Sequence, residues 1–361
     1  MSRFVQALPP GRLDIVGDVH GELGALQELL HLLGYAPDGR HPDGRRLVFV
    51  GDLVDRGPDS VGVVRLVRGL VEAGRAQVVL GNHELNLLRR QRKHGNDWFW
   101  NEASVHDRVF APYAVAAQGE REPMLAWFDS WPLALQRDDL RIVHAAWDAA
   151  SLARLDATDG SVRAGFDVWE LRAGQQAAAD GLAVRAARQR AESRHHYADP
   201  GFPMPMLDAV GQLDEARQLR NPMRVLTSGI ERCVEAPFFT SGQWRFARRV
   251  AWWDDYRDDV AVVVGHFWRR YLPVDRTRFG KGDVDLFAGI EPAAWMGARG
   301  RVFCVDFSVG GRYAERARGE TPRTCLGALR WPELELVLDD GLRVPTTGFG
   351  AAAAGETHAP K

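Results

Sequence analysis

Three apolar runs in the first quarter of the chain each end in a glycine followed by residues that can bind metal ions. The segments are Gly17-Asp18-Val19-His20-Gly21, Gly51-Asp52-Leu53-Val54-Asp55-Arg56-Gly57 and Gly81-Asn82-His83-Glu84. The pattern predicts strands and following helices because short apolar runs give way to leucines and valines at helical spacing. The predicted strands are residues 13–16, 47–50 and 78–80, and the predicted helices are 22–33, 61–73 and 85–92. Three consecutive βα units indicate an α/β fold.

Two later apolar runs end in histidine. Residues 140–143 precede His144, and residues 260–264 lead through Gly265 to His266. A lone histidine after a strand is often a buried structural residue. Open α/β sheets place their ligands in the crevice beyond the carboxyl ends of the strands, where five separate segments would meet. We therefore expect one site that contains both histidines.

The residues at these strand ends suit a pair of metal ions. Asp18 and His20, two residues apart, can face one ion, and Asp52 can bridge to a second. Two cations about 3.5–4 Å apart can clamp an in-line displacement at phosphorus and activate a water molecule. The donors are oxygen and nitrogen without a thiolate, which suits Mn most and leaves Fe, Zn, Co or Ni open. The second ion would be completed by Asn82, His144 and His266.

Three more residues beside these ligands suit catalysis. His83 follows Asn82 directly and cannot easily face the same ion, so we expect it to protonate the leaving oxygen as a general acid. Asp55 is expected to hold the His83 imidazole and raise its pKa. Arg56 offers a planar fork for two hydrogen bonds to phosphate oxygens, with a surface ion pair as its alternative role. No separate organic cofactor is indicated.

These segments resemble the signature blocks of calcineurin-like metallophosphoesterases. The likeness is to the branch of Ser/Thr protein phosphatases and bacterial symmetrical bis(5'-nucleosyl)-tetraphosphatases. It implies a β-sandwich flanked by helices (α/β/β/α), two divalent or trivalent metal ions, and hydrolysis by a metal-activated hydroxide. One departure is Trp268, since related nucleases and phosphodiesterases usually carry a second histidine there.

The resemblance leaves three functions open. The first is symmetrical hydrolysis of a dinucleoside polyphosphate such as diadenosine tetraphosphate, a phosphorylated small molecule. The second is dephosphorylation of Ser or Thr in a phosphoprotein. The third, ranked low, is a non-catalytic phosphate-binding regulatory module, which should lack a ligand or the acid. No residue of that set is missing here.

The chain of 361 residues is long enough for one elaborated domain. We expect a metallophosphoesterase domain over 1–349 with a helical or irregular insertion at about 150–221. The small-residue stretch 350–361 is expected to be a disordered tail. The resemblance says little about residues 150–220, so substrate specificity could lie there.

Composition excludes several classes of protein. A formal net charge of −2 argues against bulk binding of nucleic acid or of anionic membranes. No apolar stretch is long enough for a signal peptide or a membrane span, and three widely spaced cysteines match no disulfide framework. These features favour a cytoplasmic protein. Almost all positive charge is arginine, so no single arginine beyond Arg56 is assigned from the sequence.

Overall fold

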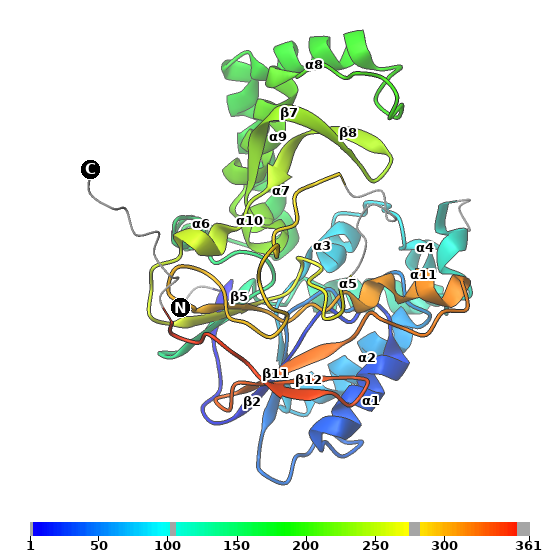
Figure 1. The fold of residues 1–361 in the computed structure, drawn as a ribbon, viewed down its shortest axis with the longest axis vertical. Helices are drawn as coiled ribbons and strands as arrows, with labels where there is room; N and C mark the ends of the chain where they lie inside the picture. The colour runs from blue at the N-terminus through cyan, green and yellow to red at the C-terminus, as the bar shows by residue number, and fades with distance from the viewer. Residues whose placement is uncertain (1–2, 102–105, 274–281, 352–361) are drawn as a thin grey trace.

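The structure is a computed structural model that describes residues 3–101, 106–273 and 282–351. Two packed sheets with helices around them form a body, and a smaller lobe of helices and one hairpin stands on it (Figure 1). Residues 352–361, most of the predicted tail, lie outside the described residues.

The first sheet of the body is mixed and contains the strands predicted from the first three segments. β2, β3 and β4 run parallel, β11 pairs antiparallel with β2, and the order is β13-β12-β11-β2-β3-β4. The strands are β2 (Leu13–Val16), β3 (Arg46–Phe49), β4 (Ala76–Val78), β11 (Gly327–Trp331), β12 (Glu335–Leu338) and β13 (Arg343–Pro345).

The second sheet contains the two strands that lead to the later histidines. β6 and β9 are parallel neighbours, so their carboxyl ends lie at the same edge of the sheet. The order is β1-β5-β6-β9-β10. The strands are β1 (Val5–Ala7), β5 (Ala134–Gln136), β6 (Leu140–Val143), β9 (Ala261–Val264) and β10 (Val302–Cys304).

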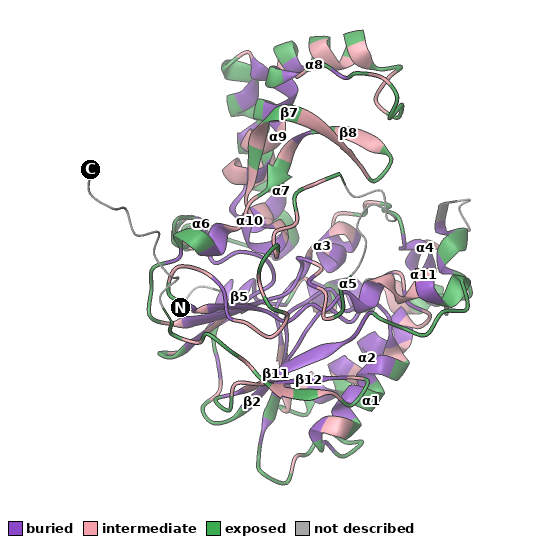
Figure 2. Cartoon of the chain, viewed as in Figure 1, coloured by how far each residue is buried: buried purple, intermediate pink, exposed green. Residues whose placement is uncertain are grey.

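The two sheets pack face to face. Leu13 and Ile15 of β2 share one hydrophobic cluster with Ile142 of β6 and Val263 of β9. Val16, on the opposite face of β2, packs in the cluster that contains the helices. Buried residues fill the body, as the purple colouring in Figure 2 shows. The α/β/β/α sandwich expected from the resemblance is confirmed.

Helices cover the outer faces of both sheets. α1 and α2 bury leucine and valine faces beside the first sheet, and Asp59 begins α2 by accepting a hydrogen bond from the Gly62 amide at 2.7 Å. The helices of the body are α1 (Leu23–Leu33), α2 (Ser60–Glu72), α3 (Asn82–Leu88), α4 (Asp97–Trp100), α5 (Gln118–Phe128), α6 (Ala149–Leu155), α10 (Pro222–Ser228) and α11 (Arg312–Ala317). Short 3₁₀ turns occur at His106–Phe110, Trp252–Asp255 and Val309–Gly311.

The lobe contains α7 (Val162–Ala179), α8 (Leu182–Ser193), α9 (Asp208–Arg220) and a hairpin of β7 (Glu231–Thr240) and β8 (Gln243–Arg249). It has its own small core, in which Phe246 of β8 packs with Val210 and Leu213 of α9. The sequence indicated helices in this region but not the hairpin. The limits of an inserted domain stay a prediction.

Within the described parts of the chain, no helix combines the length and apolar character needed to cross a bilayer.

Candidate active site

The predicted ligands converge at the carboxyl ends of strands from both sheets. Asp18 follows β2, Asp52 follows β3, and His144 and His266 follow β6 and β9. Asn82 is the first residue of α3, the helix that follows β4 after three residues. The structure therefore brings together all six residues predicted to bind metal, and all but Asn82 are at least nine-tenths buried.

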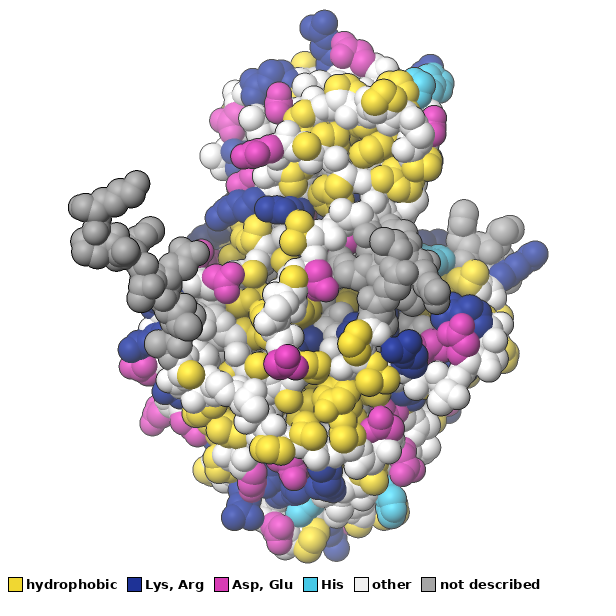
Figure 3. Space-filling view, viewed as in Figure 1, with side chains coloured by type: hydrophobic (Ala, Val, Ile, Leu, Met, Phe, Trp, Pro, Cys, Tyr) yellow, Lys and Arg dark blue, Asp and Glu magenta, His cyan; other side chains and the backbone are white. Residues whose placement is uncertain are grey.

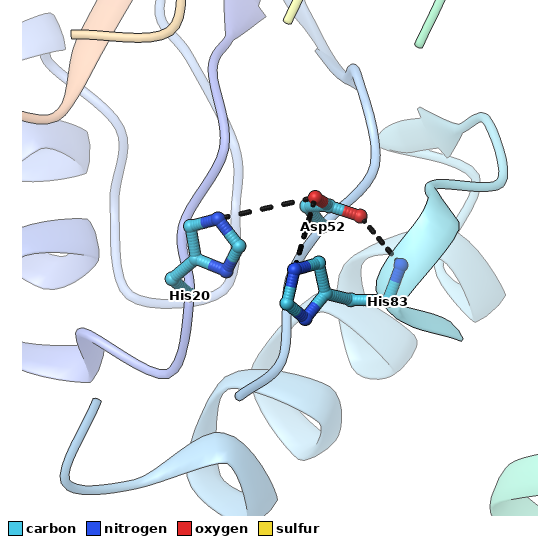
Figure 4. Close-up of side chains that lie close together, drawn as sticks. All are labelled: His20, Asp52 and His83. Atoms are coloured by element: carbon cyan, nitrogen blue, oxygen red, sulfur yellow. Dashed lines mark hydrogen bonds and ion pairs between the residues drawn. The ribbon is translucent and has the colours of Figure 1, made fainter. Parts of the chain in front are cut away.

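One group of donors is formed by His20, Asp52 and His83, shown in Figure 4. The Nε2 atom of His20 lies 3.9 Å from Oδ2 of Asp52, and Nε2 of His83 lies 3.8 Å from the same oxygen. The same His20 atom is also 3.9 Å from Oδ2 of Asp18. His20 donates from Nδ1 to the Val54 carbonyl oxygen at 3.0 Å, which leaves the Nε2 lone pair facing the carboxylates.

A second group is formed by Asp52, His144 and His266. His144 donates from Nδ1 to the Val50 carbonyl oxygen at 2.7 Å, so its Nε2 lone pair faces Oδ2 of Asp52 at 3.4 Å and Oδ1 of Asn82 at 3.2 Å. Three acceptor atoms thus converge. Nδ1 of His266 lies 2.8 Å from Oδ1 of Asn82, so the His266 ring faces the same group, while its Nε2 atom is buried without a hydrogen-bond partner among the described residues. A cation bound between these oxygen and nitrogen atoms would satisfy them, so the residues fit a metal centre.

The charges of the site support the same conclusion. Burial, and then the neighbouring carboxylates of Asp306 and Asp52, raise the pKa of Asp18 well above its ordinary value. Burial alone would also raise the pKa of Asp52, but the adjacent imidazoles of His144, His83 and His20 hold it well below its ordinary value. Among the described residues, Asp52 is the carboxylate common to both groups. It is therefore placed to bridge two ions.

His83 and Asp55 form the predicted pair. Nδ1 of His83 donates to Oδ2 of Asp55 at 2.5 Å, and the Trp98 indole donates to the other carboxylate oxygen at 2.6 Å. The tryptophan thus fixes the carboxylate that orients the imidazole. His83 nevertheless lies within the first donor group, nearer to Asp52 than the sequence suggested. Its position is compatible with an acid and with a ligand.

Arg56 lies above both imidazoles of the first group. It donates from Nη1 to Nε2 of His20 at 2.9 Å and from Nη2 to Nε2 of His83 at 3.2 Å. Its guanidinium carbon is 4.6 Å from the centre of the Trp268 ring, in a cation–π contact. Trp268, the departure noted in the sequence, therefore supports Arg56 through this contact.

Much of the site backbone lies in the left-handed region, which is uncommon for residues with a side chain. This conformation turns the polypeptide sharply after each strand and directs the side chains toward the centre. The residues, with their φ angles, are His20 (47°), Asp52 (49°), Asp55 (76°), Arg56 (72°), His266 (70°) and Trp268 (56°).

Two glycines let the backbone approach the carboxylates closely. A Cβ atom on Gly81 would lie 2.2 Å from Oδ1 of Asp52, and one on Gly265 would lie 2.0 Å from Oδ1 of Asp18. Real Cβ atoms do not approach other atoms so closely, so neither position has room for a side chain.

Sequence reasoning assigned no role in the site to four of its residues. The Asp306 carboxylate accepts hydrogen bonds from the amides of Trp268 at 2.8 Å and Ser308 at 2.7 Å, and burial raises its pKa. Asp306 closely follows an apolar strand, the same signal that identified Asp18. Glu84 accepts from the Leu53 amide at 2.8 Å, and burial raises its pKa to about 7. Burial, and then the charge of Arg249 on β8, lower the pKa of His266. Arg249 had no comparable signal in the sequence, and Trp268 stood out only as a departure from a family pattern.

The sandwich and its strand-end site resemble those of calcineurin-like phosphoesterases. A family model described as calcineurin-like phosphoesterase matches residues 11–172, so this part of the chain is a calcineurin-like phosphoesterase domain. The resemblance inferred from the sequence is confirmed.

More particular relatives are tetraphosphatases. The asymmetrical bis(5'-nucleosyl)-tetraphosphatase PrpE of Halalkalibacterium halodurans is 48% identical over 146 residues, which cover 37% of this chain and 56% of that protein. The symmetrical bis(5'-nucleosyl)-tetraphosphatase of Janthinobacterium sp. (strain Marseille) is 36% identical over 160 residues, which cover 42% of this chain and 51% of that protein. The chain spans about half the length of these curated relatives.

Among solved structures, the cold-active protein-tyrosine phosphatase of a psychrophilic Shewanella covers 95% of this chain and 84% of its own, at 17% identity and a TM-score of 0.42. A likeness at that level carries no argument about activity.

Proposed function

We propose that this protein is a dimetal phosphohydrolase that cleaves a dinucleoside polyphosphate, with symmetrical cleavage of diadenosine tetraphosphate as the specific hypothesis. The observation that carries the proposal is the pair of donor groups joined at Asp52, beside the His83–Asp55 hydrogen bond. Relatives named as bis(5'-nucleosyl)-tetraphosphatases support the choice of substrate.

The proposed ligands divide into two sets that share Asp52. Asp18, His20 and Asp52 would hold one ion, and Asp52, Asn82, His144 and His266 would hold the other. When bound, two such ions supply Lewis acidity and a nucleophile at neutral pH. Manganese is the metal we propose, because the donors are carboxylate, amide and imidazole.

The chain's own residues would orient the substrate and move the proton. Arg56 reaches both imidazoles, so a phosphoryl group bound there can replace these contacts with charge-assisted hydrogen bonds. Asp55 holds His83 through Nδ1 and so presents Nε2 to the leaving oxygen. A proton on Nε2 would pass to that oxygen as the phosphorus–oxygen bond breaks.

The cavity beside this site suits a large substrate. Its volume is about 1440 Å³, and its lining includes Arg56, Trp268 and residues of the lobe. Pockets for drug-sized ligands measure roughly 300–1,000 Å³, so the space exceeds the need of a simple phosphomonoester. Nine arginines and five acidic residues are among the described residues that line it, which favours an anionic ligand.

A Ser/Thr phosphoprotein is the second candidate substrate. The Asp55–His83 pair favours it, because an acid before the arginine is a feature that this chain shares with the protein-phosphatase branch it resembles. A regulatory module is disfavoured because every predicted ligand and the predicted acid are present at the site. We also propose a cytoplasmic location, which the three free cysteines support.

The test is turnover of diadenosine tetraphosphate, a phosphothreonine peptide and p-nitrophenyl phosphate in the presence of Mn²⁺, with the products separated. Two ADP per tetraphosphate are expected, and AMP with ATP would replace symmetrical with asymmetrical cleavage. Preference for the peptide would establish the phosphatase alternative. Absence of turnover with metal bound would contradict the enzyme proposal.

A further inference from the structure

The hairpin of the lobe carries arginines that face the same cavity as Arg56. Arg245, Arg248 and Arg249 of β8 all line it, together with Phe238 of β7. In Figure 1 the hairpin lies between α8, at the top of the lobe, and the body. In Figure 3 dark blue side chains gather at that junction, on the face shown.

These arginines differ from Arg190 and Arg224 in the same cavity wall, because none of the described residues forms an ion pair with them. Arg190 pairs with Asp214 at 2.7 Å, and Arg224 pairs with Glu170 at 2.9 Å. By contrast, the three β8 guanidinium groups form no ion pair and no side-chain hydrogen bond with any residue in 3–101, 106–273 or 282–351. Three unpaired cations on one strand repel each other, and a polyanion would relieve that repulsion.

The nearest acidic groups do not neutralise the strand. Glu231 is the cross-strand partner of Arg249, but the two side chains form no ion pair within 4 Å. Burial raises the pKa of Glu231, although Arg249 opposes the shift, and burial likewise raises the pKa of Asp214 although Arg190 opposes it. Burial also lowers the pKa of Arg249, a shift that Glu231 and Asp283 oppose. Arg249 therefore has acidic neighbours, whereas Arg245 and Arg248 form no ion pair with any described residue.

The order of the residues along β8 leads away from the candidate metal centre. Arg249 lies at the near end, since its charge acts on His266, and Arg245 is four residues further along the strand. Four residues of extended chain span about 13 Å, several times the width of one phosphate group. The charges are therefore spaced for a chain of phosphates and exceed what one phosphate needs.

An aromatic ring lies at the far end of this row. Phe238 is the direct cross-strand partner of Arg245 and also lines the cavity. Directly opposed residues of an antiparallel pair have Cβ atoms about 4.5–5.5 Å apart. A guanidinium beside an aromatic ring can hold a phosphate and stack against a flat base.

We propose that Arg245, Arg248 and Phe238 form a distal subsite for the non-reacting end of a polyphosphate chain and its terminal base. The proposal rests on the proposed function, in which the reacting phosphate lies at Arg56. It assigns to the lobe the choice of long substrates over short ones. A single phosphate ester would reach Arg56 and leave the distal subsite empty.

The kinetic test compares a long and a short substrate in the complete chain with Mn²⁺. Arg245→Ala combined with Arg248→Ala should raise KM for diadenosine tetraphosphate about tenfold or more, because two charge-assisted hydrogen bonds are lost. The constants for p-nitrophenyl phosphate should stay within about twofold of the wild type. Arg188→Ala is the matched control, since Arg188 is an exposed arginine of the same lobe that pairs with Glu192 and lies outside this cavity.

A binding test without metal separates the subsite from catalysis. Calorimetry should show that inorganic tripolyphosphate binds the wild-type protein more tightly than orthophosphate does. The double variant should lose about tenfold in affinity for tripolyphosphate alone. Phe238→Ala should leave tripolyphosphate binding unchanged and raise KM for the dinucleotide, because the ring contacts only the base.

The outcomes distinguish this inference from the proposed function. The double variant could remain active with KM for diadenosine tetraphosphate unchanged, or could lose activity equally on both substrates. Either result would overturn the proposed distal subsite and leave the proposed function standing. Binding of tripolyphosphate that depends on Arg245 and Arg248, in a protein that hydrolyses no phosphate ester, would support the anion site and overturn the proposed function. Competition by single-stranded RNA at lower concentration than tripolyphosphate would overturn the small-molecule assignment.

Discussion

The body and the lobe of this protein differ in their sequence patterns and in their proposed roles. In the body, continuous apolar strands are buried on both faces and end in the acids and imidazoles of the site. In the lobe, a small core supports helices and a hairpin whose exposed surface is rich in arginine. The residues proposed to carry out hydrolysis lie at the ends of buried strands. The residues proposed to select the substrate lie on a hairpin that is much less buried. Each prediction below tests this division of roles.

The largest effect is expected for Asp52→Asn in the body. Asp52 is common to both donor groups, so losing its charge should remove metal and lower turnover of every substrate about 10³-fold or more. Metal content by elemental analysis and initial rates would check this. Asp159→Asn, an exposed position, is the control, and an Asp52→Asn variant that kept both metal and activity would refute the bridging role.

His83→Asn should lower kcat about 10²–10³-fold while bound metal stays at the wild-type level. The Asp55 hydrogen bond is the reason to expect an acid, although His83 also lies within the first donor group. Parallel measurement of metal content and kcat separates the two roles. Loss of one metal equivalent would identify His83 as a ligand.

Phe246→Ala should destabilise the lobe and leave the body folded. This ring is 1% exposed in the lobe core, and truncating a buried Phe costs about 3–5 kcal/mol. Limited proteolysis should cut within residues 161–249, while turnover of p-nitrophenyl phosphate persists. Phe49→Ala, an equal truncation in the body, should abolish turnover of p-nitrophenyl phosphate. If Phe246→Ala also eliminated turnover of the short substrate, the two regions would not be separable.

The smallest effect is expected for Trp268, a positioning residue at the boundary of the two regions. Trp268→Leu should lower kcat/KM about tenfold for long and short substrates alike, because Arg56 loses a cation–π contact. Trp268→Phe should restore part of the rate, since a ring remains beneath the guanidinium. Steady-state kinetics on both substrates would check this, and a rate loss confined to diadenosine tetraphosphate would instead place Trp268 in the substrate subsite.

The sequence predicted the body well because its signals are local. An apolar run that ends in Gly-Asp requires no knowledge of distant residues, and the same rule would have identified Asp306 after β10. Arg249 and Trp268 could not be found in this way. Their importance depends on which residues the fold places opposite them, namely His266 and Arg56.

The hairpin was missed for a different reason. β7 contains Glu231, Glu235 and Pro237, residue types that are uncommon in strands, and the short Trp-Arg-Phe alternation of β8 gives a weak signal. Packing of Phe246 against α9 overrides these local preferences. The role of His83 was also left open by its sequence position, because its distance from Asp52 depends on how the fold places α3 beside the end of β3.

The two glycines that touch the site carboxylates have a consequence for how this protein tolerates change. Gly81 and Gly265 have no chemistry of their own, yet even alanine would displace Asp52 or Asp18. In a saturation mutagenesis screen they should therefore be as intolerant as the proposed ligands, while many charged surface positions accept most substitutions. A search for functional positions that considers only reactive side chains would therefore miss Gly81 and Gly265, two of the most restricted positions in the chain.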